Sequence, residues 1–568
     1  MGPVRPAGRV AGIQAYRVPA HPAPLDLDLR GNEGAVPDEA LFEALRGAEL
    51  LRRYPDAGPL ERRLARRLGV DADRVVVTAG GDDALDRICR AVLEPGRRAV
   101  LPVPGFEMTT RYARLAGAEV VPVPWPGAAF PRQAVCDAID ADTGLVALTS
   151  PNNPTGAVAS AEDLDALARA CRRVGALLLV DLAYTEFAEL DLCPQALALD
   201  NTVVVRTVSK AWGLAGLRVG YAVSSPEIAG WLRAAGAPFS VAAPSLALAH
   251  AALDQGDGPM EAFVRTVRQG RAELGRALQA AGCTVVPSQA NFVFARSPRA
   301  AWLADGLAGL GIGVRAFPGS PDLADALRVA CPPDAAATAR VCAGLAAVAT
   351  PQAVLFDMDG VLADVSGSYR AAIVQTAAAF GVQVDGADIA ATKARGNANN
   401  DWVLTRELLA ARGIDLPPTT VTEAFEARYQ GTKDAPGLWT TETLCVTPAW
   451  LAALAGKVRL GVVTGRPRRD ARRFLDHFGI AALFQVVVTM EDAPSKPDPA
   501  PVLRALEALG IRDAWLVGDT PDDVRAARAA GVVPLGICAP GDTDPGPLLA
   551  AGAARILSVL TELEELLP

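Results

Sequence analysis

The sequence predicts an α/β protein with more than one domain, and three observations support this class. The chain has 568 residues, more than a single hydrophobic core usually organises. Apolar residues make up 51% and charged residues 21%, as in globular proteins. Short β-branched runs alternate with helical patterns, and several runs end in polar residues. This alternation is typical of parallel sheets that bind ligands at the carboxyl ends of their strands.

Charge and composition exclude several kinds of partner. The net charge is −9, and the arginine-rich pieces at 52–53 and 62–67 are short, so nucleic acid is not expected as a partner. No apolar run reaches the ~18 residues that span a bilayer, and residues 1–20 lack the apolar core of a signal peptide. Nine cysteines without a Cys-x-x-Cys pair indicate free thiols. We therefore expect a cytoplasmic protein that acts on small molecules.

Strand and helix patterns alternate through the first half. Helices are predicted over 58–68 and 161–174, and strands over 74–78, 99–103, 120–123, 145–148 and 177–180. The first of these strands ends in Ala79-Gly80-Gly81-Asp82, before a helical pattern. Such a turn offers backbone N–H groups and a helix N-terminus to an anion, although an ordinary tight turn has the same pattern. The Gly-x-Gly-x-x-Gly spacing of a dinucleotide site is absent.

Two further predicted strands are followed by residues with ionisable side chains that could take part in catalysis. Asp181 follows an apolar run, and a buried carboxylate is costly unless a group such as a protonated pyridine nitrogen pairs with it. Lys210 follows another β-branched run, with Thr207 and Ser209 before it and Arg218 after it. A lysine amine that binds pyridoxal phosphate (PLP), with hydroxyls and an arginine on the phosphate, suits this pattern. A surface lysine in a loop is the plainer interpretation.

The order of these motifs resembles that of a known family. Ser-Pro-Asn-Asn-Pro-Thr-Gly at 150–156, Asp-x-x-Tyr at 181–184 and Ser-Lys with Leu-Ala-Gly-x-Arg-x-Gly at 209–220 follow one another along the chain. Residues ~10–345 therefore resemble a fold-type I PLP-dependent aminotransferase, and most closely a histidinol-phosphate aminotransferase. The resemblance implies a large, mixed but mostly parallel sheet and a small α/β domain.

The resemblance also implies roles at the cofactor. Lys210 forms the Schiff base and moves the proton, and Asp181 pairs with the pyridine nitrogen. Asn153 and Tyr184 hold the ring hydroxyl, and Phe106 stacks on the ring. The cofactor phosphate is held by Gly81, Asp82, Ser209, Arg218 and a Tyr54 donated by the neighbouring subunit, which implies a homodimer. Taken singly, Tyr184 and Phe106 are equally expected as core aromatics, and Tyr54 as a turn residue.

Substrate contacts follow from the same resemblance. Arg328 binds the acidic group of the substrate, Arg315 completes the clamp, and Tyr16 reaches a substrate phosphate. One site then accepts glutamate as amino donor and yields a phosphorylated amino alcohol. Asn32 is included among the substrate contacts, although its segment, residues 30–34, departs from the Asn-Glu-Asn-Pro-like sequence of the family. That departure and the bulky Trp212 leave the substrate open.

A second set of strand ends follows the alanine-rich helix predicted at 334–347. The run 354–356 ends in Asp357-Met358-Asp359, whose carboxylates lie two residues apart and therefore on one side of a strand. One can attack phosphorus while the other gives and takes the proton. Later motifs add a hydroxyl, a cation and further carboxylates: Thr464, Lys496, Asp519 and Asp523. Phosphate donors and oxygen ligands of this kind suit a phosphate ester and Mg²⁺.

These motifs resemble the haloacid dehalogenase (HAD) phosphatases. The resemblance implies Asp357 as nucleophile, Asp359 as general acid/base, and Thr464 and Lys496 as ligands of the phosphoryl group. The implied metal set is Asp357, Asp359, Asp519 and Asp523. The second acid, Asp359, favours a phosphatase over a dehalogenase, because an alkoxide leaving group needs a proton.

The two resemblances together predict a domain plan and a function. The expected segments are an arm at 1–30, an aminotransferase domain at 31–348 with its large domain at about 45–245, a linker at 349–353, and a HAD domain at 354–568 with a helical cap at about 366–448. We expect amino transfer to a phosphorylated keto substrate, followed by hydrolysis of the phosphate ester. Three alternatives remain: another phosphorylated metabolite, a PLP-dependent phospho-amino-acid decarboxylase, or a HAD domain that serves only in binding or assembly.

Overall fold

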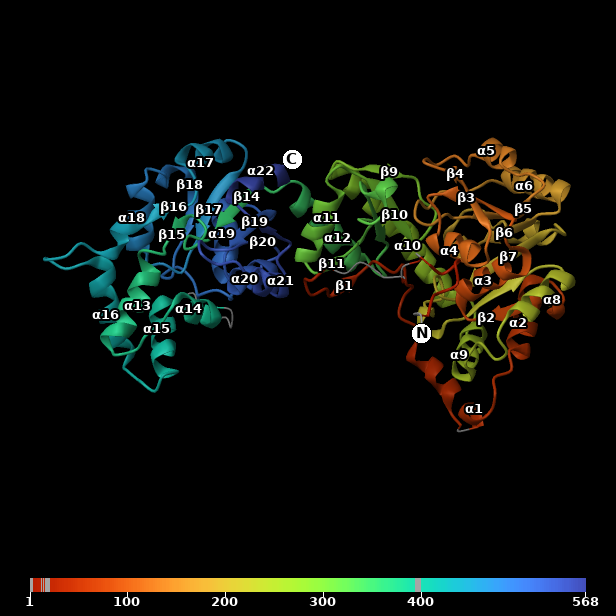
Figure 1. Ribbon diagram of the computed structural model, residues 1–568, viewed down its shortest axis with the longest axis horizontal. Coiled ribbons are helices and arrows are strands. Elements are labelled where there is room, and N and C mark those ends of the chain that lie inside the picture. Colours follow the sequence, from red (N-terminus) through yellow and green to blue (C-terminus); the bar gives the residue numbers. More distant parts are fainter. Residues whose placement is uncertain (1–3, 12, 14, 16–20, 48, 394–399) are drawn as a thin grey trace.

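The computed structural model describes residues 4–11, 13, 15, 21–47, 49–393 and 400–568. Figure 1 shows an elongated molecule with three parts in a row. A large lobe (residues 49–257) lies at one end, and a C-terminal unit (residues 353–568) lies at the other. A small lobe (residues 258–349) lies between them. Within the described residues, no helix combines the length and the apolar character needed to cross a membrane.

The large lobe is built on a seven-stranded sheet in the order β2-β8-β7-β6-β5-β3-β4. β8 runs antiparallel to both of its neighbours, β2 and β7, and the other pairings are parallel. The strands are β2 (Val75–Thr78), β3 (Arg98–Val103), β4 (Glu119–Pro124), β5 (Thr143–Thr149), β6 (Leu177–Asp181), β7 (Thr202–Thr207) and β8 (Gly220–Val223). Each strand predicted in this region is present, with ends shifted by a residue or two.

Helices cover both faces of this sheet because alternate residues of its strands point to opposite sides. In β6, Leu177 and Leu179 pack with α3, α4 and α8, whereas Leu178 and Val180 pack with α5, α6 and α7. A third cluster joins α2 and α9 to the β2 end of the sheet. The helices are α1 (Glu49–Arg52), α2 (Gly58–Leu68), α3 (Gly80–Val92), α4 (Glu107–Leu115), α5 (Arg132–Asp137), α6 (Ala161–Val174), α7 (Cys193–Leu197), α8 (Pro226–Ala235) and α9 (Ala243–Asp254).

Local sequence sets the ends of these helices. Ser160 and Asp163 form a capping box at the start of α6, and Gly175, at φ 72°, ends it. Proline stands in the first turn of α2, and Gly69, at φ 67°, follows its last residue. Both helices coincide with the predicted ranges.

The small lobe is an antiparallel sheet in the order β12-β13-β10-β9 with three helices. Its elements are β9 (Thr284–Val286), β10 (Phe292–Arg296), β12 (Arg315–Ala316), β13 (Ala326–Ala330), α10 (Gly258–Ala280), α11 (Ala300–Gly309) and α12 (Ala335–Ala349). The end of the predicted arm belongs to this lobe, because β1 (Leu27–Asp28) pairs in parallel with β11 (Ile312–Gly313). Leu29 is buried beside it.

The C-terminal unit has a six-stranded parallel sheet in the order β18-β17-β14-β19-β20-β21. These strands are β14 (Ala353–Phe356), β17 (Arg459–Val463), β18 (Phe484–Val488), β19 (Ala514–Gly518), β20 (Val533–Ile537) and β21 (Arg555–Leu557). The flanking helices are α17 (Pro448–Ala455), α18 (Arg468–His477), α19 (Ala500–Leu509), α20 (Pro521–Ala529), α21 (Gly546–Ala551) and α22 (Leu563–Leu566).

A helical cap is inserted after β14. It contains α13 (Tyr369–Ala379), α14 (Gly386–Lys393), α15 (Asp401–Ala410) and α16 (Pro418–Gln430). A two-stranded antiparallel ribbon, β15 (Ala363–Asp364) with β16 (Thr443–Leu444), lies where the chain passes between the sheet and the cap. The helical content is as predicted for this segment.

One hydrophobic cluster runs from the small lobe into the C-terminal unit. Trp302 of α11 packs edge-on against Trp515 of β19 at 5.0 Å between ring centroids, and the Trp515 indole donates to the Ala347 carbonyl. Arg555 of β21 forms an ion pair with Asp305 of α11 at 2.6 Å. The two parts are therefore packed together and not merely tethered, as the short predicted linker suggested.

Candidate active sites

The first candidate site lies at the carboxyl ends of β5, β6 and β7. Asp181 is the last residue of β6, Asn153 follows β5, and Lys210 follows β7. The Lys210 ammonium donates to the Gly31 carbonyl at 3.2 Å and lies 5.7 Å from the centroid of the Tyr184 ring. The parallel strands thus bring together residues that are up to 57 positions apart in the sequence.

The Asp181 carboxylate is buried. The backbone N–H of Ala183, at 3.1 Å, is the one hydrogen-bond donor to it among the described residues. Burial raises the pKa of Asp181 to about 6. A buried acid facing so few donors fits a protonated pyridine nitrogen, so this position agrees with the predicted contact to PLP.

A glycine turn and an arginine form a corner at the start of α3 that is suited to an anion. Gly80 begins α3 at φ 83°, and a Cβ there would lie 2.6 Å from Nη2 of Arg218. Arg218 also adopts positive φ, 51°, and its Nη2 donates to Asp82 at 3.0 Å. The predicted phosphate ligands Gly81, Asp82 and Arg218 therefore meet at the start of α3. Ser209, the residue before Lys210, accepts a hydrogen bond from the Thr207 hydroxyl at 2.8 Å.

Amide and arginine side chains close the other side of the site. Asn32 donates to the Tyr184 hydroxyl at 3.3 Å, and Asn291 donates to the Asn32 carbonyl at 3.1 Å. Arg328 donates to Asn153 Oδ1 at 2.6 Å and to the Arg30 carbonyl at 2.7 Å. The segment 30–34 that departs from the family sequence thus lines the site with its carbonyl groups. Sequence patterns do not reveal such acceptors, because every residue carries one.

The other predicted site residues make no hydrogen bond or ring contact with Lys210 within the part of the chain that the structure describes. Tyr54 is 81% exposed and stacks on Phe239 at 4.7 Å between ring centroids. Phe106 lines a hollow of about 320 Å³ beside α4. Arg315 lies opposite Arg328 in the β12–β13 pair, and its guanidinium is 3.7 Å from Glu107. Tyr16 lies outside the described residues.

The second candidate site lies at the carboxyl ends of β14, β17 and β19. Asp357 directly follows β14, and Lys496 donates to its Oδ1 at 2.9 Å and to the Val463 carbonyl at 3.0 Å. Lys496 also forms an ion pair with Asp523. Burial raises the pKa of Asp357 to about 7, an effect that Lys496 opposes and that Asp523 and Asp359 reinforce. Burial acts to lower the pKa of Lys496, but the contacts with Asp357 and Asp523 outweigh it and raise that pKa.

Carboxylate oxygens of Asp357, Asp519 and Asp523 lie within 4.8 Å of one another. Three carboxylates around one ammonium leave an excess of negative charge, which a hard divalent cation would neutralise. Gly360 is required beside this group, because it has φ 77° and a Cβ there would collide with Asp519. This arrangement fits Mg²⁺. Asp359 was predicted as a fourth ligand, but it is not part of this group.

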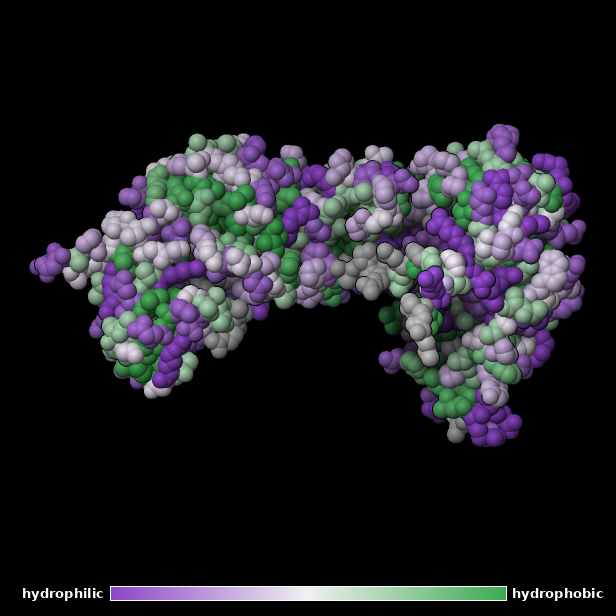
Figure 2. Space-filling model, viewed as in Figure 1, coloured by the Kyte–Doolittle hydropathy of each residue, from purple (hydrophilic) through white to green (hydrophobic). Residues whose placement is uncertain are grey.

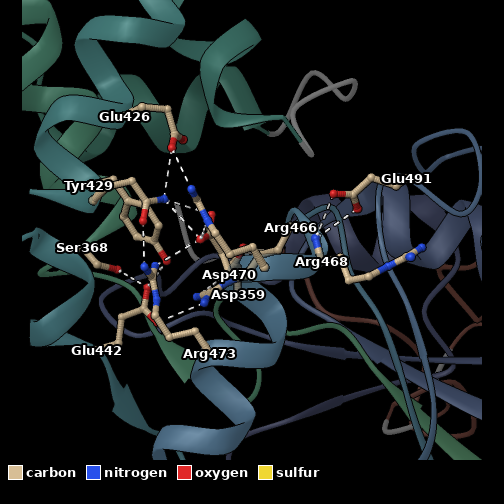
Figure 3. Close-up of polar contacts among 12 residues, drawn as sticks. Asp359, Ser368, Glu426, Tyr429, Glu442, Arg466, Arg468, Asp470, Arg473 and Glu491 are labelled. Atoms are coloured by element: carbon tan, nitrogen blue, oxygen red, sulfur yellow. Dashed lines mark hydrogen bonds and ion pairs between the residues drawn. The ribbon is translucent and has the colours of Figure 1, made fainter.

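Asp359 is paired instead with a buried arginine that sequence reasoning did not single out (Figure 3). Arg466 contacts Asp359 Oδ1 with Nε at 2.6 Å and with Nη2 at 2.5 Å, and its Nη1 donates to Glu442 at 2.9 Å. Thr464, two residues before Arg466, is buried and accepts from the Arg466 backbone N–H at 3.1 Å. A hollow of about 290 Å³ opens beside these groups, between Asp359, Tyr369, Asp401, Trp402 and Arg466.

The fold and the two sites define a class: a PLP-dependent transaminase joined to a phosphate-ester hydrolase. Residues 29–345 match the family described as aminotransferase class I and II, and the chain belongs to that family. Residues 351–531 match the haloacid dehalogenase-like hydrolase family. Members of these classes use PLP and Mg²⁺, respectively.

The relatives and solved structures that the chain resembles include histidinol-phosphate aminotransferases. A histidinol-phosphate aminotransferase from Symbiobacterium thermophilum is 41% identical over 286 residues, which cover 49% of this chain and 77% of that protein. A protein from Phytophthora nicotianae named imidazoleglycerol-phosphate dehydratase is 49% identical over 220 residues, or 37% of this chain, and this chain spans about half of its length. The crystal structure of histidinol-phosphate aminotransferase from Sinorhizobium meliloti with PLP has a TM-score of 0.53 and 29% identity, covering 57% of this chain and 90% of that one.

Proposed function

We propose that this chain catalyses two consecutive reactions: amino transfer to a phosphorylated keto substrate, and hydrolysis of the phosphate ester of the product. One observation carries the proposal. A single chain holds an aminotransferase site and a phosphatase site in parts that share one hydrophobic cluster. The similarity to histidinol-phosphate aminotransferases supports imidazole-acetol phosphate as keto substrate, glutamate as amino donor, and histidinol phosphate as the intermediate product.

The first reaction needs binding, orientation and proton transfer. PLP, when bound, supplies an electron sink conjugated to the substrate. Lys210 would move the proton between substrate carbon and cofactor carbon, from its position over Tyr184. Asp181 would pair with the ring nitrogen, and the corner of Gly81, Asp82 and Arg218 would hold the cofactor phosphate. Arg328, which the small lobe supplies, would bind the carboxylate of the donor.

The second reaction transfers the phosphoryl group to Asp357 and then to water. A carboxylate oxygen of Asp357 forms the new bond to phosphorus as the bond from phosphorus to the ester oxygen breaks. The leaving oxygen takes a proton from Asp359 and departs as the alcohol. Water then attacks the phosphorus of the aspartyl-phosphate, gives its proton to Asp359, and releases phosphate with Asp357 restored. Lys496, between Asp357 and Asp523, would hold the phosphoryl oxygens.

A homodimer is part of the proposal. Figure 2 shows apolar side chains gathered over the α1 and α9 end of the large lobe. Exposed apolar or aromatic residues in this part of the chain are Val36, Phe42, Leu51, Tyr54 and Phe239. An exposed patch of this kind favours a second copy of the chain as the partner, with Tyr54 directed to the neighbouring cofactor. Sedimentation of the holoenzyme is expected to give the mass of a dimer. The Tyr54→Ala variant is expected to bind PLP more weakly than the wild type.

The assay that tests the proposal follows two products in one reaction. Purified protein with PLP, Mg²⁺, glutamate and imidazole-acetol phosphate is expected to form 2-oxoglutarate first and inorganic phosphate after a lag. Release of carbon dioxide without 2-oxoglutarate would select the decarboxylase alternative. Transamination without any phosphate release would leave the HAD domain as a binding module and contradict the proposal.

A further inference from the structure

The guanidinium of Arg466 lies buried between two carboxylates (Figure 3). Arg466 is 2% exposed, and the ring centroids of Tyr369 and Phe474 lie 4.9 and 5.2 Å from its guanidinium carbon. A buried cation with opposed charges in fixed directions has little freedom to move, because each displacement leaves a charge uncompensated. The position of Asp359 is therefore set by Arg466.

The second carboxylate, Glu442, belongs to the connection between cap and sheet. Its Oε1 accepts hydrogen bonds from the Ser368 hydroxyl at 3.0 Å and from the Tyr429 hydroxyl at 2.9 Å. Ser368 immediately precedes α13, and Glu442 immediately follows the 3₁₀ turn Leu438–Thr441, so the two passages of the chain between sheet and cap meet here. Tyr429 adds a contact from α16. Arg466 is thus anchored to the cap on one side and to Asp359 on the other.

We propose that Arg466 is a positioning residue of the phosphatase: it places the Asp359 carboxyl at the leaving oxygen and fixes that placement relative to the cap. The inference rests on the proposed role of Asp359 as general acid. Among the described residues, Arg466 makes no hydrogen bond or ion pair with the nucleophile Asp357, which Lys496 contacts instead. Loss of Arg466 should therefore impair protonation of the leaving group more than attack on phosphorus.

Two esters separate these steps. An alkyl phosphate releases a strongly basic alkoxide and needs the proton of Asp359, whereas 4-nitrophenyl phosphate releases a stable phenolate and does not. For Arg466→Met we expect kcat on an alkyl ester to fall by about 10²-fold, because a misplacement of about 1 Å has effects of that size. On 4-nitrophenyl phosphate the fall should be less than about threefold, with KM little changed on both. The ratio of kcat on the alkyl ester to kcat on 4-nitrophenyl phosphate in Arg466→Met should approach the same ratio in Asp359→Asn.

The controls separate positioning from folding. Arg466→Met leaves Glu442 without its cation, so the double variant Arg466→Met with Glu442→Gln removes both charges and should show the same ratio. Arg466→Lys keeps the positive charge but lacks the paired N–H groups of a guanidinium. Its kcat on the alkyl ester should therefore lie between those of Arg466→Met and the wild type. Arg473→Met is the matched control. Arg473, on α18, donates to Gln430 of the cap and lies 4.4 Å from the ring centroid of Trp439, but it forms no hydrogen bond or ion pair with Asp359 among the described residues.

The experiment measures kcat and KM of the full-length holoenzyme variants with Mg²⁺ on histidinol phosphate, glycerol phosphate and 4-nitrophenyl phosphate. A selective loss on the alkyl esters in Arg466→Met and in the double variant, with an unchanged ratio in Arg473→Met, supports the inference. Equal losses on all three esters would overturn it. If the wild type hydrolyses glycerol phosphate but not histidinol phosphate, the proposed pathway fails while the same ratios still decide the role of Arg466. Inactivity of the wild type on every ester would overturn both.

Discussion

The two candidate sites balance their charges in different ways. In the phosphatase site, Lys496 contacts Asp357 and Asp523, and Arg466 contacts Asp359 and Glu442. In the aminotransferase site, the buried Asp181 carboxylate accepts from one backbone N–H of the described residues, and Lys210 donates to a carbonyl. The phosphatase side chains are thus held by one another. The aminotransferase site also contains paired side chains, Arg218 with Asp82 and Arg328 with Asn153, but its buried Asp181 forms no ion pair among the described residues.

The difference has a physical consequence. A site held by its own ion pairs loses order when one partner is removed, since the other charge is left buried. A site that keeps an uncompensated buried acid is destabilised until its ligand binds. The phosphatase site also needs one external charge, Mg²⁺, because the group of Asp357, Asp519 and Asp523 keeps a net negative charge. The following changes test this contrast.

The largest effect is expected from Lys210→Ala. It should lower transamination by at least about four orders of magnitude, because no other amine of the described residues is placed to move the proton at this site. Phosphate release from a supplied ester should stay within about twofold of the wild type. Both rates are measured on the same preparation, and loss of both activities would contradict the independence of the two sites.

Asp357→Asn is the corresponding change in the phosphatase site. Without the nucleophile, phosphate release should fall by a similar factor, while 2-oxoglutarate formation continues at the wild-type rate. Trapping of radiolabelled phosphate on the wild-type protein, and not on the variant, would identify Asp357 as the attacked residue. A variant that still releases phosphate would argue against covalent transfer.

Trp302→Ala tests whether the sites share one folded body. Trp302 is buried against Trp515, so its removal should cost about 3–5 kcal/mol of unfolding free energy. Because the lost contact joins the small lobe to the C-terminal unit, the melting transitions of both parts should move down together. Arg555→Ala, at the half-exposed ion pair with Asp305, is the comparison and should cost less than about 1 kcal/mol. A shift confined to one transition would show that the parts unfold separately.

An effect smaller than that of Trp302→Ala concerns Asp181 and pH. Its folded pKa of about 6 lies above the reference value of 3.8, so the carboxylate lowers stability above pH 6, and that penalty disappears as the pH falls toward 4. Asp181→Asn should therefore stabilise the PLP-free protein at pH 7 by up to about 3 kcal/mol and weaken PLP binding. Chemical denaturation with and without PLP measures both. A destabilised PLP-free variant would show that Asp181 is already compensated.

Much of this arrangement follows from sequence because strand ends are local features. Lys210, Asp181 and Asp357 each follow an apolar run that becomes a buried strand, and parallel pairing then brings such ends to one edge of a sheet. The pairing of Arg466 with Glu442 could not be predicted in this way, because it depends on where the cap settles. The contacts made by the backbone carbonyls of Arg30 and Gly31 could not be predicted either, because every residue carries a carbonyl. The predicted roles of individual residues and the domain limits stay predictions.

The central claim is that the phosphatase acts on the product of the aminotransferase. The most direct test uses Lys210→Ala protein, which cannot interconvert the two compounds, and compares kcat/KM for phosphate release from imidazole-acetol phosphate and from histidinol phosphate. We expect the aminated ester to be preferred by at least about tenfold, a difference of about 1.4 kcal/mol in transition-state binding. Equal or faster hydrolysis of the keto ester would contradict the claim, because the phosphatase would then consume the substrate of the first reaction.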